Sequence, residues 1–150
     1  MKKITTVLLF LLAFAFDNSA QKVLGLIQNG EPKLTLNAPD LIKVFNRKLL
    51  EVSKIDGKFS SVNLVKYNTY YLLVFKGAKL KSSFLVTEGA KDPNGYTTLV
   101  ADNTITCTTS DCASEQFGCV PDGNVGGGAC TPCSNKGTCT KTVSGSSLLE

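Results

Sequence analysis

The chain has 150 residues, with 16 lysines and arginines, 12 aspartates and glutamates, six cysteines and no histidine. The absence of histidine excludes Ser/His and Cys/His nucleophile pairs and any zinc site that uses imidazole. No carboxylate pair or Ser/Lys pair stands out by its spacing, so the sequence indicates no catalytic residue, no metal site based on histidine and no cofactor.

The N-terminus has the features of a bacterial export signal. Two lysines at positions 2 and 3 precede an almost wholly apolar run over residues 4–16, and small residues precede a cut after Ala20. A cut after Ala15 fits the same rule, so both mature starts stay open. The apolar run is shorter than the roughly 20 residues that a membrane-spanning helix needs, and no later segment is longer. We therefore expect a signal peptide over residues 1–20 and a secreted or periplasmic mature chain without a transmembrane segment.

Residues 21–106 are predicted to form the body of the protein, which begins with a hairpin and a helix. Asn29-Gly30 lies between two extended runs and favours a tight hairpin turn. Asn37 is placed to cap a helix over about 38–54. The apolar residues of this segment recur every three or four positions, as expected for one buried helix face: Leu41, Phe45, Leu49 and Val52.

After Gly57 the apolar pattern becomes that of extended strands. Extended runs occur at 59–66, 69–75, 84–87 and 96–101, and the last continues to 104–108. Short turns separate these runs, so neighbours are expected to pair antiparallel. The predicted fold class is α+β, with one amphipathic helix packed on an antiparallel β-meander of about four strands and followed by a small disulfide-rich C-terminal module. Nine residues form the predicted core: Leu41, Phe45, Leu49, Leu64, Leu73, Phe75, Phe84, Val86 and Leu99.

The body offers a possible interaction surface. Residues 22–91 carry 12 basic and 5 acidic side chains (+7), whereas residues 92–150 carry 2 and 6 (−4). Tyr70 and Tyr71 are adjacent on a predicted strand and therefore point to opposite faces of the sheet. Lys43 and Arg47 lie on the polar face of the predicted helix. These four residues are the candidate surface for a protein partner or an anionic polymer of the cell envelope; nothing in the sequence indicates nucleic acid.

All six cysteines fall within residues 107–139, which we call the cysteine-rich module. The module has few large apolar residues, so its order must come from disulfides or a metal. Three disulfides are the expected solution in an exported protein, and six cysteines allow fifteen pairings. The alternative is a zinc site with four thiolate ligands, because four residues separate Cys107 from Cys112 and two residues separate Cys130 from Cys133. The cysteines are Cys107, Cys112, Cys119, Cys130, Cys133 and Cys139.

One segment of the module also suggests redox chemistry. Cys130-Thr131-Pro132-Cys133 is similar to the active-site motif of the thioredoxin family, over four residues only. In that family the motif opens a helix whose dipole lowers the thiol pKa, and no helix is predicted after Cys133. Residues 140–150 are expected to form a flexible tail.

These patterns favour a small exported bacterial protein with a non-enzymatic binding or structural role at the cell envelope or outside the cell. A secreted hydrolase inhibitor is the first alternative, with the loop at 121–129 as its inserted element. A thiol-disulfide oxidoreductase that uses Cys130 and Cys133 is the second.

Overall fold

The computed structural model describes residues 22–101, 105–124, 128–143 and 149, so the predicted signal peptide lies outside the described residues. Within these ranges the chain forms one α-helix and eight β-strands. Their bounds are β1 Lys22–Gln28, β2 Glu31–Leu34, α1 Ala38–Ser53, β3 Phe59–Tyr67, β4 Tyr70–Gly77, β5 Lys81–Lys91, β6 Thr97–Ala101, β7 Ile105–Thr109 and β8 Thr140–Val143. In this part of the chain no helix is both long enough and apolar enough to cross a lipid bilayer.

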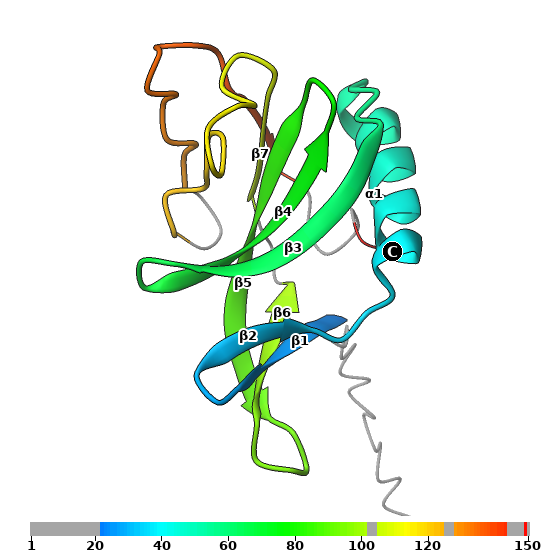
Figure 1. Ribbon diagram of the computed structural model, residues 1–150, viewed down its shortest axis with the longest axis vertical. Coiled ribbons are helices and arrows are strands. Elements are labelled where there is room, and N and C mark those ends of the chain that lie inside the picture. Colours follow the sequence, from blue (N-terminus) through cyan, green and yellow to red (C-terminus); the bar gives the residue numbers. More distant parts are fainter. Residues whose placement is uncertain (1–21, 102–104, 125–127, 144–148, 150) are drawn as a thin grey trace, which may run out of the picture.

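The strands form one antiparallel sheet in the order β2-β1-β6-β5-β4-β3, while β7 pairs with β5 and β8 pairs with β7. The long strand β5 joins the two halves of this sheet (Figure 1). Its first half, from Lys81 to Val86, pairs with β4, and its second half, from Thr87 to Lys91, pairs with β6. The strongly bent sheet therefore depends on one continuous strand.

The predicted α+β class is confirmed, but the count of about four strands is wrong. The hairpin β1–β2 joins the main sheet because β1 pairs with β6, as in the contact of Lys22 with Ala101. The extended run predicted near residues 96–108 provides two strands, β6 and β7. Strand β8 is a short polar segment, and only Thr142 in it is buried. These strands form because distant segments of the chain pair with each other. Local alternation of apolar residues does not predict such pairing.

The local signals for the hairpin and the helix are confirmed. Asn29 and Gly30 have φ values of 54° and 82°, as a two-residue hairpin turn between β1 and β2 requires. The Oδ1 atom of Asn37 accepts a hydrogen bond of 3.1 Å from the backbone N–H of Asp40 and caps α1. The helix ends at Ser53, and the following Lys54 caps it by adopting a left-handed conformation and donating its N–H to the carbonyl of Leu50.

All nine predicted core residues are buried in one cluster between α1 and the sheet. Phe45 of α1 stacks on Phe75 of β4, with ring centroids 3.8 Å apart. Val52, which the apolar spacing also placed on the buried face, is 52% exposed. The buried stripe therefore stops at Leu49, one turn before the predicted end.

Strand β4 is buried on both of its faces. Tyr71, Leu73 and Phe75 belong to the cluster under α1, whereas Leu72 and Val74 belong to a second cluster that includes Val120 of the cysteine-rich module. Figure 1 shows the resulting three layers, with α1 on one side of β3 to β5 and the module on the other. This arrangement explains why residues 70–75 form an uninterrupted apolar and aromatic run.

The cysteine-rich module is attached to the sheet at both of its ends. Strand β7 runs across the boundary expected between residues 106 and 107, and Cys107 lies opposite Ser83 of β5 and Lys141 of β8. Strand β8 includes the first residues of the segment expected to be a flexible tail. Leu149 is fully buried, and its carbonyl accepts a hydrogen bond from the Nζ of Lys22.

Candidate functional site

Three disulfides connect the cysteine-rich module, as the sequence predicts. They join Cys107 to Cys130, Cys112 to Cys133 and Cys119 to Cys139, with Cα–Cα distances of 5.7, 5.7 and 6.3 Å. These distances lie within the normal range for disulfides. Each of the first three cysteines is bonded to the cysteine three places later, so the three closed loops overlap. Residues 112–133 therefore lie inside at least two of the three loops.

This pairing uses the sulfur atoms that zinc binding or redox chemistry would need. The four cysteines of the zinc alternative form two disulfides in the structure, and no thiolate is left among them. The two cysteines of the thioredoxin-like motif are bonded to different partners, Cys107 and Cys112, and not to each other. A turn follows Cys133 where the redox motif would open a helix.

Two carboxylates join distant segments of the module through hydrogen bonds. Oδ2 of Asp111 accepts hydrogen bonds of 2.7 Å from both the N–H and the hydroxyl of Thr138. Oε1 of Glu115 accepts two bonds from Ser134, at 3.0 Å from the N–H and 2.6 Å from the hydroxyl. The bonds from Thr138, led by its hydroxyl, hold the pKa of Asp111 below its ordinary value. The acidic side chains of the module thus have a structural role.

A second set of contacts fixes the module to the outer face of β3 to β5. The hydroxyl of Tyr70 donates a 2.6 Å hydrogen bond to the carbonyl of Pro121. The hydroxyl of Ser83 donates a 2.7 Å bond to the carbonyl of Phe117. The Phe117 ring packs edge-on against Tyr67, with centroids 5.3 Å apart. The module is therefore held by polar bonds at the edges of an apolar contact.

Lys81 is a buried cation at the same contact. Its side chain is 2% exposed, and its Nζ donates to the carbonyls of Glu115 and Gln116. Burial, assisted by the charge of Lys76, lowers the pKa of Lys81, whereas Glu115 acts in the opposite direction. Sequence reasoning missed Lys81, because it follows a turn and looks like an ordinary surface lysine. Glu115 is 34 residues away in sequence and reaches Lys81 only in the folded chain.

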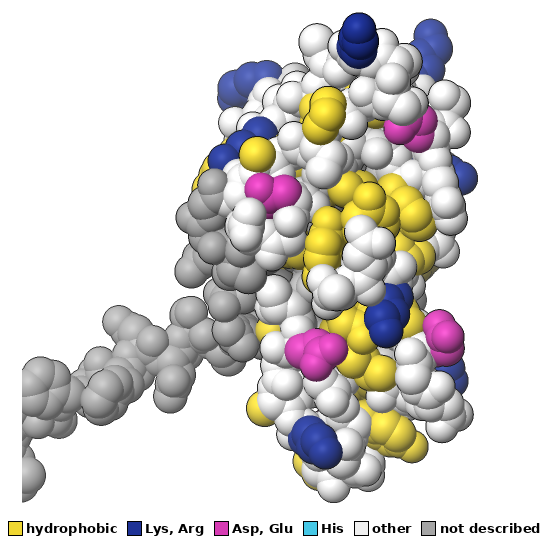
Figure 2. Space-filling view, turned by 90° about the vertical axis from the view of Figure 1, so that its left-hand side faces the viewer, with side chains coloured by type: hydrophobic (Ala, Val, Ile, Leu, Met, Phe, Trp, Pro, Cys, Tyr) yellow, Lys and Arg dark blue, Asp and Glu magenta, His cyan; other side chains and the backbone are white. Residues whose placement is uncertain are grey.

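Two pockets lie where the module meets the sheet. The proline pocket, of about 310 Å³, contains the middle residues of the thioredoxin-like motif, and its main walls are Tyr67, Glu115, Phe117, Thr131, Pro132 and Ser134. The tyrosine pocket, of about 370 Å³, lies at the start of β4, and its main walls are Tyr70, Tyr71, Leu85, Thr87, Glu88 and Gly123. Figure 2, which views this side of the molecule, shows apolar side chains gathered near the centre of the face.

An aromatic cluster lies at this junction. The rings of Tyr67 and Tyr70 are 5.4 Å apart, and Tyr67 also contacts Phe117. All three side chains are partly buried, so each has one side packed and another open to solvent. We call the surface formed by Tyr67, Tyr70, Phe117 and the two pockets the seam, and it is the candidate functional site.

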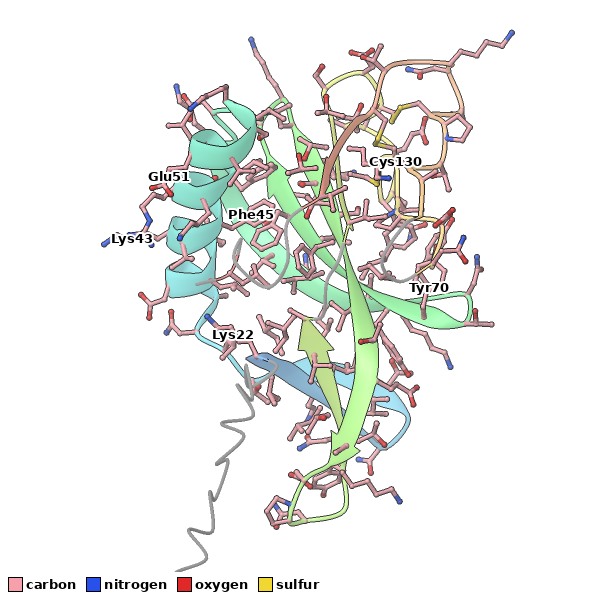
Figure 3. All side chains as sticks on the ribbon, turned by 180° about the vertical axis from the view of Figure 1, so that it is seen from behind. Lys22, Lys43, Phe45, Glu51, Tyr70 and Cys130 are labelled. Atoms are coloured by element: carbon pink, nitrogen blue, oxygen red, sulfur yellow. A yellow bond between two sulfur atoms is a disulfide. The ribbon has the colours of Figure 1, made fainter. Side chains whose placement is uncertain are left out.

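The structure does not bring the four predicted surface residues together. Tyr70 and Tyr71 point to opposite faces as expected: Tyr70 packs against the module, whereas Tyr71 is 5% exposed and belongs to the cluster under α1. Lys43 and Arg47 are exposed on the outer face of α1, where the Nε of Arg47 is 4.0 Å from Glu51. Figure 3 shows the labelled helix residues and Tyr70 on opposite sides of the molecule. The four residues therefore do not form one surface.

The remaining seam residues were not apparent from the sequence. Tyr67 is a tyrosine in a predicted turn and carries only a weak signal for binding, and Phe117 and Pro132 give no signal beyond their position among cysteines. Comparisons of the chain with protein-family models, with curated proteins and with solved structures found no match.

Proposed function

We propose that this chain is an exported, non-enzymatic binding protein that acts at the bacterial cell envelope or outside the cell, and that it binds a protein partner at the seam. Three disulfides and the lack of a membrane-spanning helix among the described residues are compatible with an extracellular or periplasmic location. The carboxylates of the module support a binding role over a catalytic one, because Asp111 and Glu115 serve as structural acceptors.

The observation that carries this proposal is the partly exposed aromatic cluster between two pockets. Tyrosine is enriched at binding hot spots because its ring supplies a large contact area and its hydroxyl a hydrogen bond. Disulfides on one side and the sheet on the other hold the cluster in place. A partner would therefore spend little free energy on ordering this surface.

Site-specific photocrosslinking in the producing cells tests the proposal. A photoreactive phenylalanine analogue replaces Thr69 beside the tyrosine pocket or Pro132 beside the proline pocket, and both positions are exposed. The matched control replaces Leu50, which is 46% exposed on α1. We expect one distinct protein adduct from the two seam positions and none from Leu50. Tyr67→Ala in the same chains should remove the adduct.

Two results would contradict the proposal. One is the absence of any adduct from Thr69 and Pro132 in correctly folded, exported protein. The other is the same set of adducts from Leu50 as from the seam positions, because that pattern indicates random collision.

A hydrolase inhibitor is a second candidate, supported by the base of the loop at 121–129. The N–H of Asp122 donates a 2.9 Å hydrogen bond to the carbonyl of Ala129, and Pro121 forms a β-bridge with Cys130. The two ends of the loop are thus held together by backbone hydrogen bonds. Residues 125–127 of the loop lie outside the described residues. Inhibition of a protease or glycosidase that disappears when the loop is shortened would favour this function over seam binding.

A further inference from the structure

The tyrosine pocket lies where β4 begins, at Tyr70, because β4 does not extend alongside the second half of β5. The last residue pair between the two strands is Tyr71 with Val86, whereas β5 continues to Lys91. Beyond Val86, β5 pairs with β6 on its other edge, first through Thr87 and Val100. Within the described residues no strand pairs with the β4 side of Thr87–Lys91. One edge of a strand is therefore open beside the pocket.

The walls of the pocket are closely fitted. Gly123 of the module lies against the ring of Tyr70, and a Cβ atom at this position would come within 2.9 Å of the ring carbon Cε1. Its φ of +87° also favours glycine. The Tyr70 hydroxyl is held by the carbonyl of Pro121. The aromatic wall is thus fixed before any ligand arrives.

The charges around the pocket are negative, although residues 22–91 carry an excess of lysine and arginine. Glu88 lines the pocket directly and is exposed at its rim. Burial, followed by the charge and hydrogen bond of Glu88 and the charge of Glu31, raises the pKa of Tyr71. Burial, followed by Tyr67 and Asp122, raises the pKa of Tyr70. A carboxylate therefore acts on each phenol, Glu88 most strongly on Tyr71 and Asp122 more weakly on Tyr70.

We propose that the tyrosine pocket binds the side-chain cation of a lysine or arginine in an extended segment of the partner protein. The ring of Tyr70 and the carboxylate of Glu88 both line the pocket, and both are complementary to such a cation. The open edge of β5 offers backbone hydrogen bonds to a segment in strand conformation, as in other proteins that bind peptides by strand addition. This inference rests on the proposed function, because it names the chemistry that the seam recognises.

A peptide titration of the intact, oxidised protein tests the inference. The probe is the blocked peptide acetyl-Gly-Val-Lys-Val-Gly-amide, and its control has glutamine in place of lysine. Amide NMR signals identify the binding site. We expect shifts at residues 69–71 and 87–89, an affinity about tenfold higher for lysine than for glutamine, and weaker binding at high salt.

Two variants sharpen the titration. Glu88→Gln removes the pocket charge while keeping a hydrogen-bond acceptor for Tyr71, and it should reduce the affinity for the lysine peptide about tenfold. Glu51→Gln removes an exposed carboxylate on α1 and should leave that affinity unchanged. Unchanged amide spectra away from each substitution show that both variants are folded.

Three results would overturn the inference: equal affinity for the two peptides, shifts confined to other surfaces, or the same loss of affinity in Glu51→Gln as in Glu88→Gln. Shifts at 69–71 and 87–89 that appear on raising the protein concentration without peptide would also overturn it, because they assign this edge to a second copy of the chain. Photocrosslinking to a partner at Thr69 with no preference for the lysine peptide leaves the proposed function intact and rejects only the cation site. Peptide binding at the pocket without any photocrosslinked adduct in cells keeps the cation site and rejects the proposed function.

Discussion

The two layers on either side of the β3 to β5 sheet are ordered by different forces. Under α1, the cluster consists of large apolar side chains such as Phe45, Phe75 and Phe84, each fully buried. On the module side, the corresponding cluster consists of Ile105 of β7 and the six half-cystines. The first layer gains its stability from apolar burial, and the second from covalent bonds and carboxylate acceptors. A segment with few apolar residues can thus present a rigid surface.

The two layers share the sheet that lies between them. Strand β4 supplies Leu73 to the helix side and Leu72 to the module side, and neither is exposed. Strand β5 is bonded to β4 through its backbone and to the module through Lys81 and Ser83. The module is therefore a third layer of the fold. Loss of the body should disorder the module, whereas loss of the module's bridges should leave the body folded.

The largest expected effect comes from Phe45→Ala. The substitution removes a buried ring that stacks on Phe75 and leaves a cavity, so we expect the free energy of unfolding to fall by about 3–5 kcal/mol. Val52→Ala, on the exposed side of the same helix, should change it by less than about 0.5 kcal/mol. Urea denaturation followed by circular dichroism measures both. Similar losses for the two variants would contradict the assignment of the core to Leu41, Phe45 and Leu49.

A smaller effect is expected from removing one bridge. In the double variant Cys112→Ser, Cys133→Ser the free energy of unfolding of the module should fall by about 2–4 kcal/mol, because its unfolded state gains freedom. The helical circular dichroism signal should persist, and cleavage by an added protease should increase within 107–139. Joint loss of the helical signal and of protection in the module would show that the body needs the bridge.

The smallest effect is expected on acidification. Hydrogen bonds lower the pKa of Asp111 in the folded state, so its contribution to stability is present above the unfolded pKa of about 3.9. That contribution is lost as pH falls through the folded pKa. In Asp111→Asn, the thermal midpoint should therefore depend less on pH below about 4 than in the parent chain. Parallel pH profiles for the two proteins would remove Asp111 from the set of structural acceptors.

Local patterns predicted the elements that depend on neighbouring residues. The Asn29-Gly30 turn, the Asn37 cap and the buried face of α1 up to Leu49 follow from short-range rules, and the structure has all three. The disulfide bonding of all six cysteines was also predictable from their even number beside a predicted export signal. Which cysteine joins which was not, because fifteen pairings satisfy the same spacing.

The seam could not be predicted, because its residues come from segments that meet only in the folded chain. Tyr67 and Phe117 are 50 residues apart in sequence, yet their rings are in contact. Lys81 gains its carbonyl partners from residues 115 and 116. Strand β8 has the composition of a polar tail, and it becomes a strand because β7 offers it an edge. Long-range pairing decided each of these features.

The most direct test of the difference between the layers is hydrogen–deuterium exchange of the full chain before and after complete reduction of its three disulfides. Alkylation of six thiols, detected by mass, verifies the reduction. We expect amides in 110–139 to lose protection, while those of α1, β3 and β4 keep most of theirs. Retained protection throughout the reduced module, or its collapse together with that of α1, would contradict the conclusion that disulfides order one layer and apolar burial the other.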